Sequence, residues 1–468
     1  MEVRGQAVRV AGHGTPEPAD NQHRTYVGSI RTMSVTVSAT LAMNEALAEQ
    51  RRRGVPVLPT GFGEAGLPVH PTMREVLAAG SDRNAYGPVA GSHELHVAAA
   101  GYWERRGLPT DPGLVVAGPG SKPLLYSLLL SVGGDVAIAS PSWVSYAAQA
   151  RLAGHHPLLV PTPPAQGGIP EPDLLAAAVA DARAAGRDVR AVIVTTPDNP
   201  TGTVASRETV ARLSHVACEL DLVIISDEIY RDLVHDPQTR VHSPAEYAPE
   251  RTVVSTGLSK SLALGGWRLG VARLPDSELG RRLRADMLGV ASEIWSSPAG
   301  PVQHAAAYAF AEPTDVAEYV ARSRRLHGIV ARAVTDRFVA AGAMVAAPQA
   351  AFYLYPDFDA WRSRLATEHG VHSGSELSQL LLHTHAMGVL PAAEFGENDT
   401  ALRVRVATSM LYGDTDAQRY SALVADDPTA LPWIRGHLDR LDEILADITG
   451  KPVPSGAQSS AAVCSRAG

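Results

Sequence analysis

Short runs of apolar residues alternate with amphipathic segments through the first two thirds of the chain. The runs contain few polar positions, which is typical of strands buried on both faces of a sheet. The strands predicted in this way lie at 114–117, 135–139, 156–160, 189–195, 222–226, 252–256 and 269–272. Helical spacing predicts helices at 40–53, 71–79, 92–106, 141–152, 172–185 and 206–220, and an apolar helix that ends at 130. This alternation predicts an α/β fold, with a largely parallel sheet and helices on both sides.

The pattern changes after Pro301. Helices are predicted at 302–311, 316–341, 375–385 and 420–448, with strand-like segments at 344–346, 351–355 and 402–407. This mixture predicts a second, smaller α+β domain with its own core. We therefore expect a flexible N-terminal extension at 1–33, an N-terminal part of the small domain at 34–60, a large domain at 61–325, the small C-terminal domain at 326–449 and a flexible tail at 450–468.

Composition narrows the class of protein. A formal net charge of −8 argues against a nucleic-acid binder, which would present a basic face. Cys218 and Cys464 form no disulfide framework. No apolar run reaches the ~18 residues of a membrane span, and the N-terminus lacks an apolar signal core. These features predict a cytoplasmic protein without a membrane or nucleic-acid partner, and we expect no metal site.

Lysine is scarce, and one lysine stands in a distinctive setting. It occurs only at positions 122, 260 and 451, although lysine and arginine together total 41. Unlike arginine, lysine can lose its proton and form a Schiff base with an aldehyde. Ser259 precedes Lys260, and Arg268 follows in a position suited to gripping a phosphate. An aldehyde cofactor with a phosphate, pyridoxal phosphate, fits this stretch; taken alone, a solvated lysine beside a glycine turn fits it as well.

Polar residues follow several of the predicted strands, where a parallel sheet binds ligands. The turn 118–122 opens a helix and can bind an anion. Trp143 could stack on a flat ring or simply pack, and Asn199 could be a turn former. Asp227 ends an apolar strand, where a carboxylate is costly without a cation such as a protonated pyridine nitrogen. Tyr230 could donate to a ring hydroxyl.

Four motifs in order resemble the fold-type I pyridoxal-phosphate aminotransferases, in particular the bacterial aspartate aminotransferase branch. They are Asn-Pro-Thr-Gly at 199–202, Asp-Glu-Ile-Tyr at 227–230, Ser-Lys with a following Arg at 259–268, and Arg-Val-Arg-Val-Ala at 403–407. Further matches stand at 38–40, 86–91, 120–122, 141–146 and 266–268, so the resemblance runs from about 37 to 408. It implies an aspartate-aminotransferase-like fold: a large cofactor-binding domain with a mostly parallel seven-stranded-type sheet, plus the smaller α+β domain.

The resemblance also implies a role for individual residues. Lys260 forms the Schiff base with pyridoxal phosphate and moves the substrate proton, Asp227 pairs with the pyridine nitrogen, and Tyr230 assists. The other cofactor-binding residues it implies are Gly120, Ser121, Lys122, Trp143, Asn199, Ser259, Arg268 and, from a neighbouring subunit, Tyr86. The substrate-binding residues it implies are Arg403, Asn199, Trp143, Thr40, Gly63 and Trp295. Arg403 is preferred to Arg405 for the substrate α-carboxylate, because 403–409 aligns with the family's Arg-Ile-Ser-Tyr-Ala-Thr-Ser.

The substrate and the reaction type are less sharply indicated. Lys122 and Thr40 match positions that contact a distal carboxylate in aspartate-specific relatives, whereas Trp295 replaces a small residue and puts aspartate in doubt. We expect a homodimeric aminotransferase of amino acid metabolism or biosynthesis, acting on an α-amino acid and a 2-oxo acid. One alternative is elimination, replacement or cyclisation, as in aminocyclopropane-carboxylate synthase acting on S-adenosylmethionine, which the Lys-Ser-Leu-Ala-Leu run at 260–264 resembles. A remote alternative is a non-enzymatic regulator.

Overall fold

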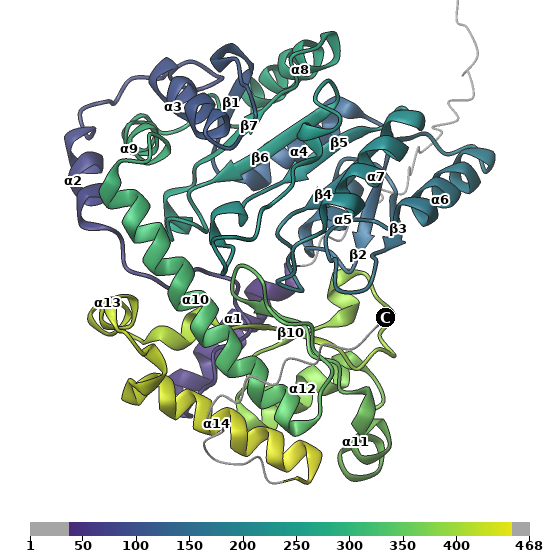
Figure 1. Cartoon of the computed structure of the whole chain (residues 1–468), viewed down its shortest axis with the longest axis vertical. Coiled ribbons are helices and arrows are strands. Elements are labelled where there is room, and N and C mark those ends of the chain that lie inside the picture. Colours follow the sequence, from purple (N-terminus) through teal and green to yellow (C-terminus); the bar gives the residue numbers. More distant parts are fainter. Residues whose placement is uncertain (1–36, 452–468) are drawn as a thin grey trace, which may run out of the picture. The chain divides into compact units, whose positions relative to one another are not determined.

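The computed structural model describes residues 37–451, and those from Ser38 onward belong to one compact unit (Figure 1). The predicted extension at 1–33 and nearly all of the predicted tail at 450–468 lie outside the described residues. Among the described residues no helix is long and apolar enough to cross a membrane.

A seven-stranded sheet forms the larger part of the structure. Its strands are β1 (Val115–Gly118), β2 (Asp135–Ser140), β3 (Pro157–Pro161), β4 (Val189–Thr195), β5 (Val223–Asp227), β6 (Thr252–Gly257) and β7 (Gly270–Arg273). They lie in the order β1-β7-β6-β5-β4-β2-β3. Only β7 runs antiparallel to its neighbours, so the prediction of a mostly parallel sheet is confirmed.

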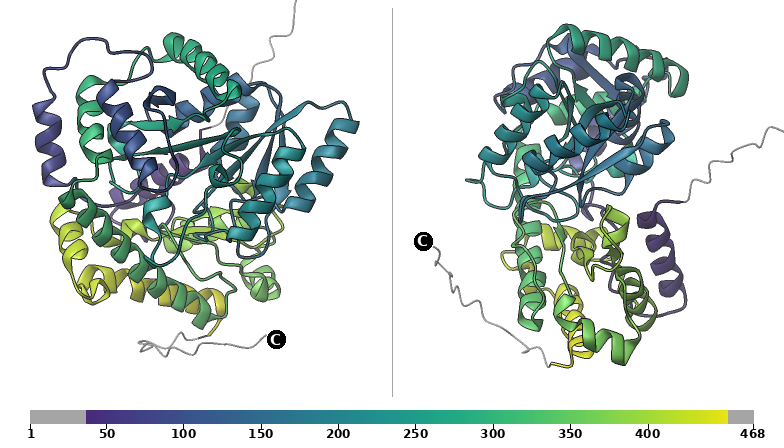
Figure 2. Two further views of the ribbon diagram at one scale, coloured as in Figure 1. Left: turned by 45° about the horizontal axis from the view of Figure 1, so that its top comes forward. Right: turned by 90° about the vertical axis from the view of Figure 1, so that its right-hand side faces the viewer.

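Helices cover both faces of this sheet (Figure 2). They are α2 (Pro71–Ala79), α3 (His93–Glu104), α4 (Ser121–Val132), α5 (Ser145–Leu152), α6 (Pro172–Ala184), α7 (Arg207–Glu219), α8 (Glu278–Ile294) and α9 (Gly300–Phe310). Successive strand residues face opposite layers: Val115 and Ala117 pack with α3 and α9, whereas Val116 packs with α4 and α8. This two-sided burial explains why the strands read as continuous apolar runs.

A three-stranded antiparallel sheet lies in the second part of the chain. It contains β8 (Tyr353–Leu354), β9 (Leu390–Pro391) and β10 (Val404–Ala407) in the order β8-β10-β9. The helices in this part are α1 (Ala39–Arg52), α10 (Thr314–Ala341), α11 (Arg362–His369), α12 (Gly374–His385), α13 (Asp416–Val424) and α14 (Pro432–Thr449). A separate apolar core joins β10 to α10, α12 and α14. The exact domain boundaries remain a prediction.

Two helical predictions need correction. The single helix predicted at 420–448 is wrong, because α13 ends at Val424 and α14 begins only at Pro432. Pro428 and Pro432 lack the backbone N–H that a continuous helix would use. Helices α8 and α11 were not predicted; α8 buries little more than a narrow stripe that includes Leu283, Met287 and Ala291, so polar residues dominate its sequence.

Candidate functional site

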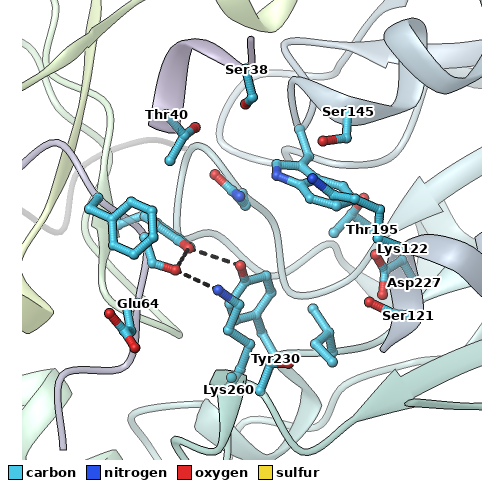
Figure 3. Close-up of a pocket in the computed structure, with 18 of the residues that line it drawn as sticks. Ser38, Thr40, Glu64, Ser121, Lys122, Ser145, Thr195, Asp227, Tyr230 and Lys260 are labelled. Atoms are coloured by element: carbon cyan, nitrogen blue, oxygen red, sulfur yellow. Dashed lines mark hydrogen bonds between the residues drawn. The ribbon is translucent and has the colours of Figure 1, made fainter. Parts of the chain in front are cut away.

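A cavity of about 430 Å³ lies at the carboxyl ends of the parallel strands. Asp227 ends β5, Thr195 ends β4, and Lys260 follows β6 in a short turn. Most of the predicted site residues line it: Thr40, Gly63, Ser121, Lys122, Trp143, Asn199, Asp227, Tyr230, Ser259, Lys260 and Arg268. Figure 3 shows Lys260 and Tyr230 side by side, with Ser38 and Thr40 from the start of α1 also at the cavity.

The Lys260 side chain enters the cavity beside aromatic rings. Its Nζ donates to the carbonyl oxygen of Gly63 at 2.5 Å and lies 5.7 Å from the ring centre of Tyr230. It forms no ion pair with any carboxylate of residues 37–451. A lysine without a carboxylate partner, in a partly desolvated site, is a suitable amine for covalent chemistry.

Asp227 is a buried carboxylate that forms no ion pair with any cation of residues 37–451. It is 3% exposed and accepts hydrogen bonds from the hydroxyls of Tyr146 at 2.9 Å and Ser255 at 3.3 Å. Burial raises its pKa to about 6. A cation bound in the cavity would favour the charged form of the Asp227 carboxylate, and a protonated pyridine nitrogen would be such a cation.

An anion site is built where β1, α4 and β7 meet. Gly120 precedes α4 with φ +97°, and a Cβ there would overlap the guanidinium of Arg268. Arg268 donates to the carbonyls of Gly265 at 2.7 Å and Pro119 at 3.4 Å and has no carboxylate partner among the described residues. With Ser121 at the helix N-terminus and Ser259 nearby, the arrangement suits a phosphate.

Lys122 adds a second cation beside this anion site. Its Nζ lies 5.0 Å from the ring centre of Trp143. Burial, and then the charges of Arg268 and Lys260, lower the pKa of Lys122. These like charges gather here, and none of the three cations forms an ion pair among the described residues, which indicates that this side of the cavity binds anions.

The prediction of Arg403 as carboxylate binder is wrong in its placement. Arg403 is ion-paired with Asp357 at 2.8 Å and Glu397 at 2.7 Å and does not line the cavity. Arg405, two positions further along the chain, does line it and is 1% exposed. It forms no ion pair within residues 37–451, and its Nε has no hydrogen-bond partner there. Residues two apart in a strand share a face, so the strand pattern alone does not separate the two arginines.

Three other predicted residues do not line this cavity: Gly120, in the turn before α4, Tyr86 and Trp295. Tyr86 is 92% exposed, and Trp295 packs near Gly118 at the start of the anion-binding turn. The roles predicted for them, a contact of Tyr86 with a neighbouring subunit's cofactor and of Trp295 with substrate, remain predictions. Conversely, sequence reasoning missed Tyr146 and Tyr353, which line the cavity and bond Asp227 and Tyr230 respectively. Tyr146 ends the motif 141–146, which was the one signal available for it.

The residues of the cavity fit pyridoxal phosphate. The cofactor needs an amine for its aldehyde, an anion beside its ring nitrogen and donors for its phosphate. Lys260, Asp227 and the turn with Arg268 meet these three needs from three sides. The Oδ1 atom of Asn199 is buried without a partner among the described groups, which is consistent with a ligand contact there.

Comparison with known proteins gives the family. The chain matches the model of class I and II aminotransferases over residues 62–411. A probable aspartate/prephenate aminotransferase of Thermus aquaticus is 32% identical over 337 residues, covering 70% of this chain and 84% of that protein. An aspartate aminotransferase of Geobacillus stearothermophilus is 31% identical over 400 residues, covering 83% and 96%. The structure of Thermus thermophilus aspartate aminotransferase with maleate has a TM-score of 0.71 at 28% identity, covering 83% of this chain and 95% of that one.

The chain therefore belongs to the class I and II aminotransferases. Members of this family use pyridoxal phosphate, so the predictions of fold type I, of this cofactor and of amino-group transfer are confirmed. Elimination or cyclisation chemistry and a non-enzymatic role are not favoured by these relatives.

Proposed function

We propose that this aminotransferase takes the amino group from a dicarboxylic amino acid such as aspartate and gives it to a 2-oxo acid. The observation that carries the proposal is a pair of cations, Arg405 and Lys122, which line one cavity without a carboxylate partner among the described residues. Two cations in one cavity complement a substrate with two carboxylates.

Arg405 is the proposed partner of the substrate α-carboxylate. Its guanidinium lies 5.2 Å from the ring centre of Tyr353 and 5.4 Å from that of Phe395, and it donates to the carbonyl of Gly61 at 2.6 Å. Burial lowers its pKa. Because a buried charge is costly until an anion pairs with it, an incoming carboxylate gains a strong, oriented partner.

Lys122 is the proposed partner of the distal carboxylate. Thr40 lines the same cavity, and its hydroxyl has no hydrogen-bond partner among the described groups. Trp295, which raised doubt about aspartate, does not line the cavity of its own subunit. The named relatives support the same substrate class, since two are aspartate or aspartate/prephenate aminotransferases and a third was solved with the dicarboxylate maleate.

The remaining residues are assigned by their place in the cavity. Lys260 would hold pyridoxal phosphate, its Nζ taking the proton from the substrate Cα and returning it. Asp227 would pair with the ring nitrogen, Tyr230 and Asn199 would contact the ring hydroxyl, and Trp143 would cover the ring. Gly120, Ser121, Ser259 and Arg268 would hold the phosphate. The cofactor supplies an electron sink for the carbanion that forms when Cα loses its proton.

The assembly and the location belong to the same proposal. We propose a homodimer in which Tyr86 and the segment 292–298 reach the neighbouring subunit's cavity. Tyr86 is 92% exposed in the single chain, so its ring is free to contact a second subunit. A role in cytoplasmic amino acid metabolism or biosynthesis is proposed from the family alone.

The test compares substrates that differ in one carboxylate. Lys122→Gln is expected to lower kcat/KM for aspartate about 100-fold and to change that for alanine little, because one charged contact contributes roughly 1.5–3 kcal/mol. Arg405→Lys should lower kcat/KM for both aspartate and alanine, because both substrates carry an α-carboxylate. The matched controls are Lys451→Gln, which changes an exposed lysine, and Arg403→Lys, which changes the ion-paired neighbour. A wild-type enzyme that turns over alanine as well as aspartate, with no effect of Lys122→Gln on their ratio, would overturn the proposed substrate class.

A further inference from the structure

Tyr353 lines the cavity but has no role in the function proposed above. It lies on β8 and is 1% exposed. Its hydroxyl oxygen is 2.9 Å from the hydroxyl oxygen of Tyr230 and 3.4 Å from the carbonyl oxygen of Gly63. Lys260 donates to the same Gly63 oxygen at 2.5 Å, so the dashed lines from Tyr230 and Lys260 meet in one small network (Figure 3).

The Tyr353 ring has little freedom to move. A Cβ at position 63 would stand 2.5 Å from its hydroxyl oxygen, so the ring lies close against the backbone of Gly63. A Cβ at Gly202, where φ is +70°, would overlap the carbonyl oxygen of Tyr353. β8 is also held against β10 by the pair Ala407 and Tyr353. The position of the oxygen is therefore fixed, and only the hydroxyl proton can choose between acceptors.

The available acceptors decide where the hydroxyl proton of Tyr353 points. Burial, and then the neighbouring Tyr353, hold the pKa of Tyr230 well above its ordinary value, so Tyr230 keeps its proton. The Gly63 carbonyl already accepts from Lys260 over a shorter distance than from Tyr353. Tyr353 can donate to the Gly63 carbonyl or to the oxygen of Tyr230, and the contact with Tyr230 is the shorter, 2.9 Å against 3.4 Å. When Tyr353 donates to Tyr230, the single proton of Tyr230 is left to point into the cavity.

We infer that Tyr353 is a positioning residue whose hydroxyl directs the proton of Tyr230 into the cavity, toward the ring hydroxyl of the cofactor. The inference rests on the proposed contact between Tyr230 and that hydroxyl. The charged groups around the two tyrosines are Lys260 after β6, Asp227 at the end of β5 and Arg405 on β10. Arg405 packs on the Tyr353 ring, and the Tyr353 hydroxyl contacts Tyr230, so Tyr353 links the proposed substrate carboxylate site to Tyr230.

The experiment follows the visible absorption of the enzyme loaded with pyridoxal phosphate as pH is varied. In Tyr353→Phe no hydroxyl remains at position 353 to orient the proton of Tyr230. Tyr230 then stabilises the ionised ring hydroxyl of the cofactor less well. The pH at the midpoint of the absorption change is expected to rise by about half to one pH unit, which corresponds to the free energy of one neutral hydrogen bond. kcat should fall about tenfold while the Kd of maleate changes by less than about twofold, because Arg405 keeps its place. The matched control is Tyr355→Phe, whose hydroxyl bonds Glu397 at 2.6 Å outside the cavity and which should leave the midpoint unchanged.

Two further variants make every outcome decisive. Tyr230→Phe must raise the midpoint at least as much; if it does not, the proposed role of Tyr230 fails. If Tyr230→Phe shifts the midpoint and Tyr353→Phe does not, the inference about Tyr353 fails alone. Gly63→Ala pushes the Tyr353 hydroxyl from its place, so it should reproduce the shift in the wild-type background and add nothing to Tyr353→Phe. Should Tyr353→Phe not fold, an unchanged midpoint in Gly63→Ala overturns the inference.

Discussion

At the scale of the residue, Asp227 makes the protein's stability depend on pH in a definite direction. In the cofactor-free protein its pKa is about 6, against an ordinary 3.8. A carboxyl whose folded pKa is raised contributes its full stability below the ordinary pKa and loses it as pH rises through the folded value. The free energy of unfolding of the wild-type cofactor-free protein should therefore fall by up to about 3 kcal/mol between pH 4 and pH 7 because of Asp227.

The Asp227→Asn variant tests this effect. Because asparagine does not titrate, the cofactor-free variant should gain stability relative to wild type as pH rises from 4 to 7, measured by urea unfolding at each pH. Asp286→Asn, which replaces an exposed carboxylate on α8, is the control and should follow the wild-type curve. A constant difference between Asp227→Asn and wild type across this range would contradict the raised pKa.

Arg403, which precedes β10, and Arg405, which lies in it, mark the limit of residue-level prediction. The chemistry of the pattern required an arginine for a carboxylate, and both Arg403 and Arg405 satisfied it. Their difference arises from partners that the fold supplies: Asp357 and Glu397 neutralise Arg403, whereas Arg405 forms no ion pair within the described chain. Tyr353 escaped prediction for the same reason, since its function depends on Gly63 and Tyr230.

At the scale of the element, most strands of the large sheet were predictable because they are apolar on both faces, whereas their order in the sheet required the structure. Four strands of the sheet are fully buried along their length, so their sequences carry the signal without ambiguity. The two-residue strands β8 and β9 carry almost none. α8 was missed because its apolar stripe is narrow, and the break between α13 and α14 was missed although two prolines marked it.

The contact between β7 and the turn before α4 provides a prediction at this scale. A Cβ at Gly270, the first residue of β7, would stand 2.6 Å from the amide nitrogen of Ser121 and 2.7 Å from the carbonyl carbon of Gly120. Gly270→Ala must push the turn away from Arg268, so the affinity for pyridoxal phosphate should fall at least about tenfold, the effect of losing one or two good phosphate contacts. Titration of the cofactor-free protein measures it.

Gly289→Ala is the matched control for that variant. Gly289 lies within α8 with nothing near the new Cβ, so alanine there should stabilise the helix by roughly 1 kcal/mol and leave cofactor affinity unchanged. An affinity in Gly270→Ala equal to that of wild type would show that the turn tolerates displacement and does not hold the phosphate.

At the scale of the whole molecule, the cavity draws on both sheets. Asp227 and Lys260 follow strands of the large sheet, whereas Tyr353 and Arg405 lie in the small one. A site divided in this way explains why the family motifs are scattered from 38 to 407. It also explains why no single motif identified the function, whereas the order of the motifs along the chain did.

The last prediction concerns the proposed dimer with shared sites. If Tyr86 completes the neighbouring subunit's cavity, Tyr86→Phe should weaken phosphate binding and lower activity, and Lys260→Ala should be inactive. In a hybrid of the two, one cavity combines Lys260 with the partner's Tyr86 and carries neither defect, whereas the other carries both. Mixing the variants, with time for subunit exchange, should therefore raise activity per active subunit above that of Tyr86→Phe alone. The control replaces Tyr86→Phe by Tyr420→Phe, an exposed tyrosine on α13 that should show no such gain. A fully active monomer by light scattering at assay concentration, or a mixture no more active than its parts, would refute shared sites, because complementation requires a residue to cross a two-fold interface.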